Sequence, residues 1–352
     1  MQFAIAIPTD AESWRVVRRA EELGFARAWF YDTQMLSADP FVAMAAAAMK
    51  TTRIRLGTGV LIPSNRIAPV AANAFASLNK LAPGRIDFGV GTGFTGRRAM
   101  GLGAIKLADL EEYVRVVRAL LQGETVEAEI EGKKRLIRLL NPELGLINTR
   151  DPVRVYVAAS GPRARSLTAK LGAGWIATAG DVTAMADMRE RWRAAGRSVE
   201  RLEAVVMTGG AILEDGEPLD SPRVIAQAGP RAAMLLHRAA DAALAGLPMT
   251  APMPPSVADA VAGYVELARK FTPQSAHYLE NHRGHLMFVK SEERPFITAE
   301  LIRQTTFTGT ERELKERIAA LADAGYDEVA LQIVPGQEHA IEDWGRIRRA
   351  FA

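Results

Sequence analysis

The hydrophobic pattern of this chain alternates between two periods along most of its length. Short runs rich in Val, Ile and Phe predict buried strands, and apolar residues at helical spacing between them predict amphipathic helices. The predicted strands occupy residues 3–7, 25–31, 54–61, 86–90, 153–159, 175–178, 204–213 and 328–334. The predicted helices between and after them cover residues 14–23, 40–49, 69–81, 107–121, 163–171, 185–195 and 313–324. This alternation predicts an α/β fold, a closed (β/α)8 TIM-type barrel rather than an open sheet.

Two segments interrupt the alternation. Residues 125–151 have the pattern of a hairpin that turns at Gly132, followed by a surface loop. Residues 215–310 contain helical patterns, and a stretch of that length is too long for an unstructured loop. We therefore expect one domain over residues 1–352, with a hairpin insertion and a helical cap inserted between strands seven and eight.

The composition fits a soluble globular protein, with 48% hydrophobic and 24% charged residues. A formal net charge of +3, with the arginines spread along the chain, gives little support to a nucleic-acid partner. The chain has no cysteine, which excludes disulfides and thiolate chemistry and makes the cytoplasm the default location. We expect no membrane partner, because the longest apolar run, residues 41–49, is about half of what a bilayer requires.

A glycine pattern follows the fourth predicted strand. Gly91, Gly93 and Gly96 fit the G-x-G-x-x-G spacing of dinucleotide-binding folds. The residues that follow do not begin a long helix, and the acidic residues Glu111 and Glu112 lie within a predicted helix instead of at the end of the next strand. We therefore reject the dinucleotide interpretation. We expect these glycines to let the backbone approach a flat ligand closely.

Small polar residues end two later strands. They are Ser160, Gly161, Pro162, Thr178, Ala179 and Gly180. Loops after late barrel strands, together with the free N–H groups at the start of a helix, form a phosphate site in many barrels. The same residues also suit ordinary strand-to-helix turns, and their spacing alone does not choose between the two.

Titratable residues occur in two places. His277, His282 and His285, with Glu280, suggest a metal site by residue type, but their spacings do not put the three imidazoles on one helical face. We expect no metal there, and interpret the segment as a polar substrate pocket or as buried, hydrogen-bonded histidine. Asp32 ends the second strand, where it could act as a base or cap the next turn, and neither interpretation leads.

Three motifs occur together in one order. They are LGTGVLIPSNRIAPVAANAFASLNKLAPGR, GVGTG, and VYVAASGP followed by GAGWIATAG. With these motifs the chain resembles the luciferase-like flavin oxidoreductase superfamily. It is most similar to the deazaflavin-using branch, which contains the coenzyme F(420)-dependent glucose-6-phosphate dehydrogenases and methylenetetrahydromethanopterin reductases. The resemblance runs from the first strand through Gly180 and again from Phe307 to the end.

The resemblance implies a barrel that binds FMN or the deazaflavin coenzyme F(420) at its C-terminal edge, and relatives that often form homodimers. It also implies a non-prolyl cis peptide bond between Gly59 and Val60, against the cofactor ring. The cofactor-binding residues expected on this basis are Thr58, Gly59, Val60, Gly91, Thr92, Gly93, Phe94, Ser160, Gly161, Pro162, Thr178, Ala179 and Gly180.

Two residues depart from the sugar-phosphate dehydrogenase pattern. In those relatives a histidine follows the aspartate that ends strand two, and a glutamate follows the Gly-Thr-Gly of strand four. This chain has Thr33 and Phe94 at these places. Proton abstraction from a sugar hydroxyl then lacks its acid and base, so we reject a sugar phosphate as the substrate.

The function predicted from the sequence is hydride transfer between the flavin or deazaflavin and a small organic substrate. Asp32, Thr33 and His282 are the expected catalytic residues on the substrate side. One alternative is a two-component monooxygenase that uses O₂ and takes reduced FMN from a separate flavin reductase. A second alternative is a flavin-binding protein without turnover, because no catalytic acid or base is evident.

Overall fold

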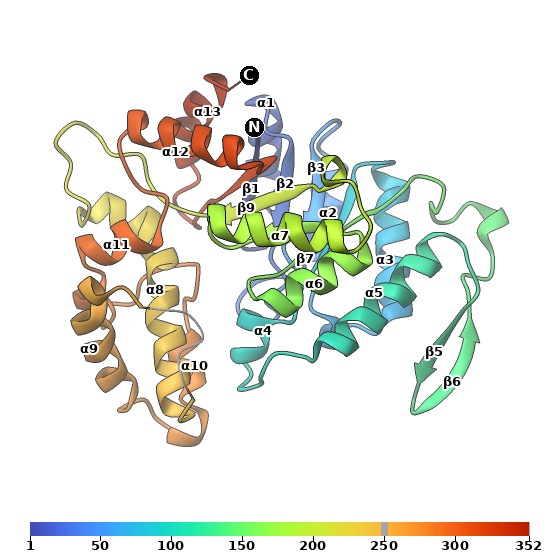
Figure 1. The fold of residues 1–352 in the computed structure, drawn as a ribbon, viewed down its shortest axis with the longest axis horizontal. Helices are drawn as coiled ribbons and strands as arrows, with labels where there is room; N and C mark the ends of the chain where they lie inside the picture. The colour runs from blue at the N-terminus through green and yellow to red at the C-terminus, as the bar shows by residue number, and fades with distance from the viewer. Residues whose placement is uncertain (248–252, 352) are drawn as a thin grey trace.

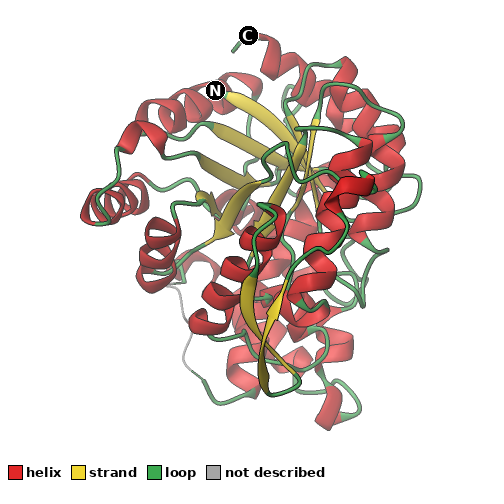
Figure 2. Ribbon diagram, turned by 90° about the vertical axis from the view of Figure 1, so that its right-hand side faces the viewer, coloured by secondary structure: helices red, strands yellow, loops and turns green. Residues whose placement is uncertain are grey.

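Eight parallel strands close into a barrel in the computed structural model, which describes residues 1–247 and 253–351. The barrel order is β1, β10, β9, β8, β7, β4, β3, β2, and Figure 2 shows these strands enclosed by helices. The strands are β1 (Gln2–Ile7), β2 (Arg27–Phe30), β3 (Arg55–Thr58), β4 (Ile86–Val90), β7 (Arg154–Ala158), β8 (Gly174–Ala177), β9 (Ala204–Thr208) and β10 (Glu328–Gln332). The predicted (β/α)8 barrel is confirmed.

β3 and β9 end three and five residues before the ends that the sequence pattern predicts. β3 leaves the ladder after Thr58, and pairing with β4 resumes only at a single bridge between Leu61 and Val90. β9 ends at Thr208 because the returning chain crosses the next residues: a Cβ on Gly210 would lie 2.1 Å from the carbonyl oxygen of Phe307. Both interruptions fall at the C-terminal ends of strands, where barrel enzymes carry their sites.

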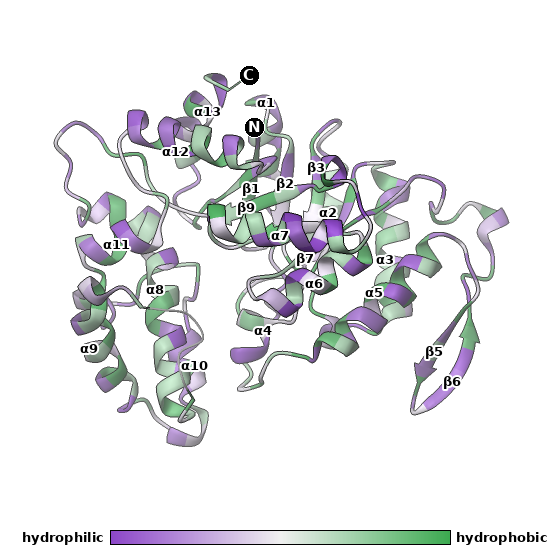
Figure 3. Ribbon diagram, viewed as in Figure 1, coloured by the Kyte–Doolittle hydropathy of each residue, from purple (hydrophilic) through white to green (hydrophobic). Residues whose placement is uncertain are grey.

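Helices cover the outside of the barrel and bury their apolar faces against it. Figure 3 shows apolar colours along the strands, whereas the outer helices α7 and α12 carry both colours. These helices are α1 (Trp14–Glu22), α2 (Pro40–Ala48), α3 (Ala68–Leu81), α5 (Leu107–Leu121), α6 (Pro162–Leu171), α7 (Val182–Ala194), α12 (Glu311–Ala324) and α13 (Ala340–Arg349). α13 and the short α4 (Phe94–Arg98) are additions to the predicted elements. Within the described ranges, no helix combines the length and apolarity needed to cross a membrane.

The two interrupting segments have different structures. Residues 125–151 contain the antiparallel pair β5 (Val126–Ile130) and β6 (Lys133–Ile137), which projects from the barrel in Figure 1. Between β9 and β10 lie α8 (Pro222–Leu244), α9 (Ala258–Ala268), α10 (Tyr278–His282) and α11 (Ala299–Thr305), which gather at one side of the barrel. We call these four helices and the loops between them the cap. Residues 248–252 of this predicted insertion lie outside the described part.

A buried charged layer closes the N-terminal end of the barrel. Arg27 forms ion pairs with Asp87 at 2.8 Å and with Glu328 at 2.9 Å, and Arg55 binds Asp87 from the neighbouring strand at 2.6 Å. Arg27, Asp87 and Glu328 are at most 4% exposed. Buried charges are tolerated only when they are paired in this way. The layer lies at the end of the barrel opposite the predicted site, so it contributes to the stability of the scaffold.

Candidate active site

The predicted cofactor residues follow strands that are neighbours in the barrel. β8, β7, β4, β3 and β2 are consecutive in the barrel order, although hairpin and helices separate β4 from β7 in the sequence. Parallel strands present their C-terminal ends at one edge. The structure therefore brings the strand-end candidates into one continuous arc, whereas His282 lies in the cap at the end of α10.

The ends of β3 and β4 pack against each other through small residues. The peptide bond between Gly59 and Val60 is cis, as the resemblance implies. A Cβ on Gly91 would lie 2.8 Å from Cγ2 of Val60 and 3.4 Å from Cβ of Ala158 on β7. The hydroxyl of Thr58 is buried and donates to the carbonyl oxygen of Gly89 at 2.6 Å. Thr58 therefore connects β3 to β4. The backbone of Gly59 and Gly91 forms the surface beside Val60.

The ends of β7 and β8 are open and polar. The hydroxyls of Ser160 and Thr178 lie 3.4 Å apart, and both residues are exposed. Gly161 precedes the first residue of α6, and a Cβ on it would meet nothing within 4 Å. Free N–H groups at the start of a helix and two hydroxyls form a donor set that suits a phosphate group. This geometry fits the phosphate-bearing end of a flavin or deazaflavin.

Asp32 is buried, and its carboxylate is bound within the protein. It accepts hydrogen bonds from the N–H of Ile62 at 2.9 Å, from Asn65 at 3.2 Å and from Arg66 at 3.2 Å. Burial raises the pKa of Asp32 above its ordinary value, although these three partners oppose the shift. Asp32 thus holds the loop at residues 62–66, which comes after β3 and after the cis peptide bond.

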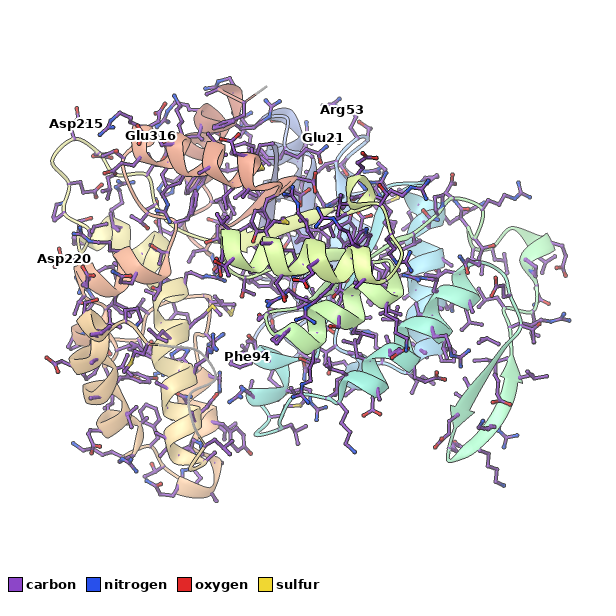
Figure 4. The ribbon with its side chains drawn as sticks, in the orientation of Figure 1. Glu21, Arg53, Phe94, Asp215, Asp220 and Glu316 are labelled. Carbon is purple, nitrogen blue, oxygen red and sulfur yellow. The ribbon has the colours of Figure 1, made fainter. Side chains whose placement is uncertain are left out.

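Phe94 and Thr33 face different neighbours. The ring of Phe94 lies 4.3 Å from the guanidinium carbon of Arg98 and 5.3 Å from that of Arg238, so it joins α4 to α8 of the cap. Figure 4 shows Phe94 between α4 and the cap helices. Thr33 is half-buried, and its hydroxyl lies 2.7 Å from that of Ser37. Position 94 therefore holds an aromatic ring beside two arginines, and it has no carboxylate that could act as a general base.

Cap side chains extend over the mouth of the barrel. Leu286 packs with Trp29, Met207 and other residues that line the barrel interior, and it is 9% exposed. From α8, Arg231 donates to the carbonyl oxygens of Thr178 at 2.5 Å and Met207 at 3.2 Å. Burial lowers the pKa of Arg231. These contacts connect the cap directly to the arc of strand ends.

Two surface hollows lie away from this arc. One of about 390 Å³ is bounded by α5 and β5, and one of about 350 Å³ lies between the start of α8 and residues 287–291. Neither is lined by a predicted site residue. The candidate site is therefore identified by the residues at the strand ends and not by these two hollows.

His282 belongs to a buried group of three histidines within the cap. His237 of α8 and His285 complete the group, and all three are 1% exposed. His277, which the sequence pattern placed with His282 and His285, is only half-buried, and its Nδ1 atom lies 3.2 Å from the carbonyl oxygen of Gln274. Asp241 accepts from His282 at 3.1 Å and from Arg98 at 2.8 Å, so α4 connects this group to the barrel.

Sequence reasoning missed His237, Arg231 and Leu286. The signal available for His237 was its i, i+4 spacing to Asp241 on α8. Nothing in the pattern pairs α8 with residues about 45 positions later, because that contact depends on how the cap folds. Leu286 has a left-handed backbone, φ 62°. This conformation is uncommon for leucine, so the sequence gives no reason to expect it.

Curated relatives match part of the chain. A stretch of 144 residues is 41% identical to the F(420)-dependent glucose-6-phosphate dehydrogenase of Beutenbergia cavernae. The matched stretch covers 39% of this chain and 41% of that protein. The chain spans about half the length of the first curated relatives it matches.

Solved structures match the fold over nearly the whole length. The coenzyme F(420)-dependent tetrahydromethanopterin reductase of Methanopyrus kandleri superposes with a TM-score of 0.69 and 20% identity, covering 98% of this chain and 97% of the reductase. An F(420)-dependent secondary alcohol dehydrogenase, in complex with an F(420)–acetone adduct, superposes with a TM-score of 0.68 and 16% identity, with 98% and 97% covered. The sequence also matches the luciferase-like monooxygenase family over residues 8–328. With this match and the barrel described above, the chain belongs to the luciferase-like monooxygenase family.

Proposed function

We propose that this protein is a deazaflavin-dependent oxidoreductase that transfers hydride between coenzyme F(420) and a small organic substrate. The observation that carries the proposal is the arc of strand ends from β8 to β2, with a phosphate-type donor set at one end and a small-residue surface at the other. The F(420)-dependent activities named for the relatives support the cofactor.

The residues at the arc fit the cofactor in two parts. Ser160 and Thr178 would hold the phosphate through their hydroxyls, and the open backbone at Gly161 would bring it close to the free N–H groups that follow Pro162 in α6. Val60 and the backbone at Gly91 would contact the ring. The remaining predicted contacts are Thr58, Gly59, Thr92, Gly93, Phe94, Pro162, Ala179 and Gly180. When bound, the deazaflavin supplies a ring carbon that exchanges hydride with the substrate.

The residues on the substrate side orient groups and exclude water. Leu286, on the loop that closes over the barrel, keeps water away from the reacting atoms. We propose that Asp32 acts through position, since its carboxylate oxygens already bind Ile62, Asn65 and Arg66. The substrate-side roles of Thr33 and His282 stay predictions: Thr33 carries a hydroxyl after the end of β2, and His282 lies in the cap with its Nε2 atom on Asp241.

Glucose-6-phosphate is not the substrate we propose. Thr33 and Phe94 stand where the resemblance gives the sugar-phosphate dehydrogenases a histidine and a glutamate. The ring of Phe94 lies close to two arginines, and position 94 has no carboxylate that could abstract a proton from a sugar hydroxyl. A small alcohol or carbonyl compound, whose hydride transfer depends on orientation, suits this arrangement better.

A second candidate is a two-component monooxygenase that receives reduced FMN from a separate reductase. The name of the family, luciferase-like monooxygenase, favours it. A homodimer and a cytoplasmic location stay predictions from the sequence.

Cofactor titration tests the proposal most directly. Purified protein is titrated separately with F(420) and with FMN while the fluorescence of each is followed. We expect saturable binding of F(420), weaker binding of FMN, and oxidation of a secondary alcohol, but not of glucose-6-phosphate, with loss of the F(420) absorbance. Tight FMN binding with O₂ consumption by the reduced protein would support the monooxygenase. Binding without turnover on any substrate panel would support a carrier, and binding of neither cofactor would contradict the assignment.

A further inference from the structure

Three buried histidines converge inside the cap from different segments. His237 lies in α8, His282 ends α10 and His285 follows three residues later. Each offers a ring nitrogen, and these three nitrogens all lie within 4.8 Å of one another. The Nδ1 atoms of His237 and His285 are 2.6 Å apart. At this distance the two nitrogens cannot both direct a lone pair at each other. In a buried site, a proton or a metal ion must lie between them.

The outer nitrogen of each ring already has a partner. Nε2 of His237 lies 2.7 Å from a carboxylate oxygen of Glu293, and Nε2 of His282 lies 3.1 Å from both oxygens of Asp241. Nε2 of His285 lies 3.3 Å from the hydroxyl of Thr95. The Nδ1 atoms therefore remain for the centre of the group. An imidazole that donates its outer N–H to a carboxylate and keeps its inner nitrogen free has the arrangement of a metal ligand.

Counting protons leaves one of these inner nitrogens without a partner. Glu293 and Asp241 form salt bridges with Lys290 and Arg98, both at 2.8 Å, so the two carboxylates accept hydrogen bonds and donate none. The Nε2 atoms that face these carboxylates must then carry the protons, and Nδ1 of each of these two histidines has a lone pair.

His285 can give its Nδ1–H to only one of these lone pairs, and Nδ1 of His237 receives it. Nδ1 of His282 is buried and has no hydrogen-bond partner. A buried acceptor left unsatisfied costs about 1–3 kcal/mol. A single cation at the centre would satisfy all three nitrogens at once, with the hydroxyl of Thr95 then accepting from Nε2 of His285.

We propose that His237, His282 and His285 bind one divalent transition-metal ion, Zn²⁺ being the type case, through their Nδ1 atoms. Neutral imidazole suits Zn²⁺, Co²⁺ and Ni²⁺, and three histidines leave a fourth position for water. The proposal does not depend on the cofactor or substrate of the proposed reaction, but it gives His282 a role as a ligand in place of the substrate-side role predicted from the sequence. It also departs from our expectation of no metal, which considered His277, His282 and His285 without His237.

Charged side chains surround the group. Lys290 and Arg98 are paired with Glu293 and Asp241, and Arg231 is bound to two carbonyl oxygens. Glu293 and Asp241 orient the imidazoles that they hold, and the binding energy of an ion must come from the three nitrogen ligands. The ion would join α8 to the loop after α10, beside Thr95 and Arg98 of α4. It would therefore fix the cap where the cap meets the barrel.

Metal binding is tested on untagged, full-length protein stripped with a chelator. Zinc content is measured after dialysis against Zn²⁺, and Co²⁺ is titrated while visible absorption is followed. The chain has no cysteine, so tetrahedral Co²⁺ bands would report on imidazole and oxygen ligands. We expect one ion per chain, and a Zn²⁺-dependent rise in Tm because the ion binds the folded state. Wild-type protein that holds neither ion in stoichiometric amount would overturn the proposal.

Variants locate the site. His282→Ala and His285→Asn should each weaken Co²⁺ binding at least tenfold. His277→Ala and His339→Ala remove the two histidines outside the group and should leave the bands unchanged. Bands that persist in both cluster variants, or disappear in either control, would assign the ion to another site and refute the proposal. If a cluster variant does not fold, the wild-type bands, metal content and Tm shift, together with the two controls, still decide the matter.

Discussion

The side-chain amide of Gln332 donates a hydrogen bond of 2.5 Å to the carbonyl oxygen of Leu286. Gln332 is the last residue of β10, and Leu286 belongs to the cap loop, so this bond joins the barrel to its cap. Leu286 holds a left-handed backbone, φ 62°, which is uncommon for a residue with a bulky side chain. Such conformations persist where surrounding contacts enforce them.

Gln332→Ala should loosen this connection. Loss of the buried hydrogen bond should lower the free energy of unfolding by about 1 kcal/mol and leave the Leu286 carbonyl without its donor. We expect a higher KM for substrate with a smaller change in kcat, measured by F(420) reduction. Gln304→Ala removes an exposed amide, bound to Glu300 at 2.7 Å, and should change neither quantity. Equal effects of the two substitutions would show that the bond does not hold the cap.

Gly91→Ala should obstruct the surface at the ends of β3 and β4. The new Cβ would lie 2.8 Å from Cγ2 of Val60, so that side chain must move into the space beside the glycines. We expect cofactor affinity to fall about tenfold, which is about 1.4 kcal/mol, in a fluorescence titration. Gly103→Ala is the matched control, because a Cβ there would meet nothing within 4 Å. Unchanged affinity in the Gly91 variant would remove this surface from the site.

A negative charge at the start of α6 should show whether the phosphate of the cofactor binds there. Gly161→Glu and Gly161→Gln both fit, since a Cβ at this position meets open space and φ is −96°. Only the glutamate places a negative charge where a phosphate would bind. We expect it to weaken cofactor binding at least tenfold, less so at high salt, while the glutamine variant binds nearly as the wild type does. If the two variants bound equally well, the phosphate would lie elsewhere.

Asp87 should be important for stability and not for the reaction. Asp87→Ala would remove the carboxylate partner of Arg55 and leave Arg27 with Glu328 alone, and breaking a buried pair in this way typically costs about 3–5 kcal/mol. Asp343→Ala removes a surface ion pair with Arg346 and should cost less than about 1 kcal/mol. Urea unfolding measures both. A small effect at Asp87 would mean that the charged layer rearranges or admits water.

The barrel could be predicted from the sequence because each strand–helix–strand unit is formed by residues close together in the chain. Residues 54–90 carry a strand, a helix and a strand whose periodicities are set by neighbours within the same segment. Parallel strands joined by helices then have one common arrangement, which puts Gly59 and Gly91 at the same edge. The family motif added the cis peptide bond at Gly59, which periodicity does not encode.

The cap side of the site depended on contacts that no local pattern encodes. His237 and His285 meet only because α8 packs against the loop after α10, and the sequence separates them by 48 residues. Residue type and nearness in the sequence instead grouped His277 with His282 and His285, whereas the structure places His277 outside the group. Asp32 shows a similar limit, since its position at a strand end was predicted while its three partners in the β3–α3 loop were not.

Acid should weaken the start of the cap through Glu217. Its carboxylate accepts from Arg223, at 3.0 Å from Nε, and from Ser221, the N-cap of α8, at 2.6 Å. These bonds lower the pKa of Glu217 to about 2, below its ordinary value of 4.5. Because the folded pKa lies below the unfolded one, this stabilisation is complete above about pH 4.5 and is lost as the pH falls toward about 2.

Glu217→Gln should therefore be less stable than wild type at about pH 6, with a difference that shrinks as the pH falls to about 3. Urea unfolding across this range measures it, and Glu214→Gln is the control. Glu214 is 77% exposed and lies 3.7 Å from the same arginine, Arg223, so its replacement should give a small difference with little pH dependence. A Glu217 difference that stays constant from about pH 6 to about pH 3 would mean that the carboxylate acts by shape and not by charge.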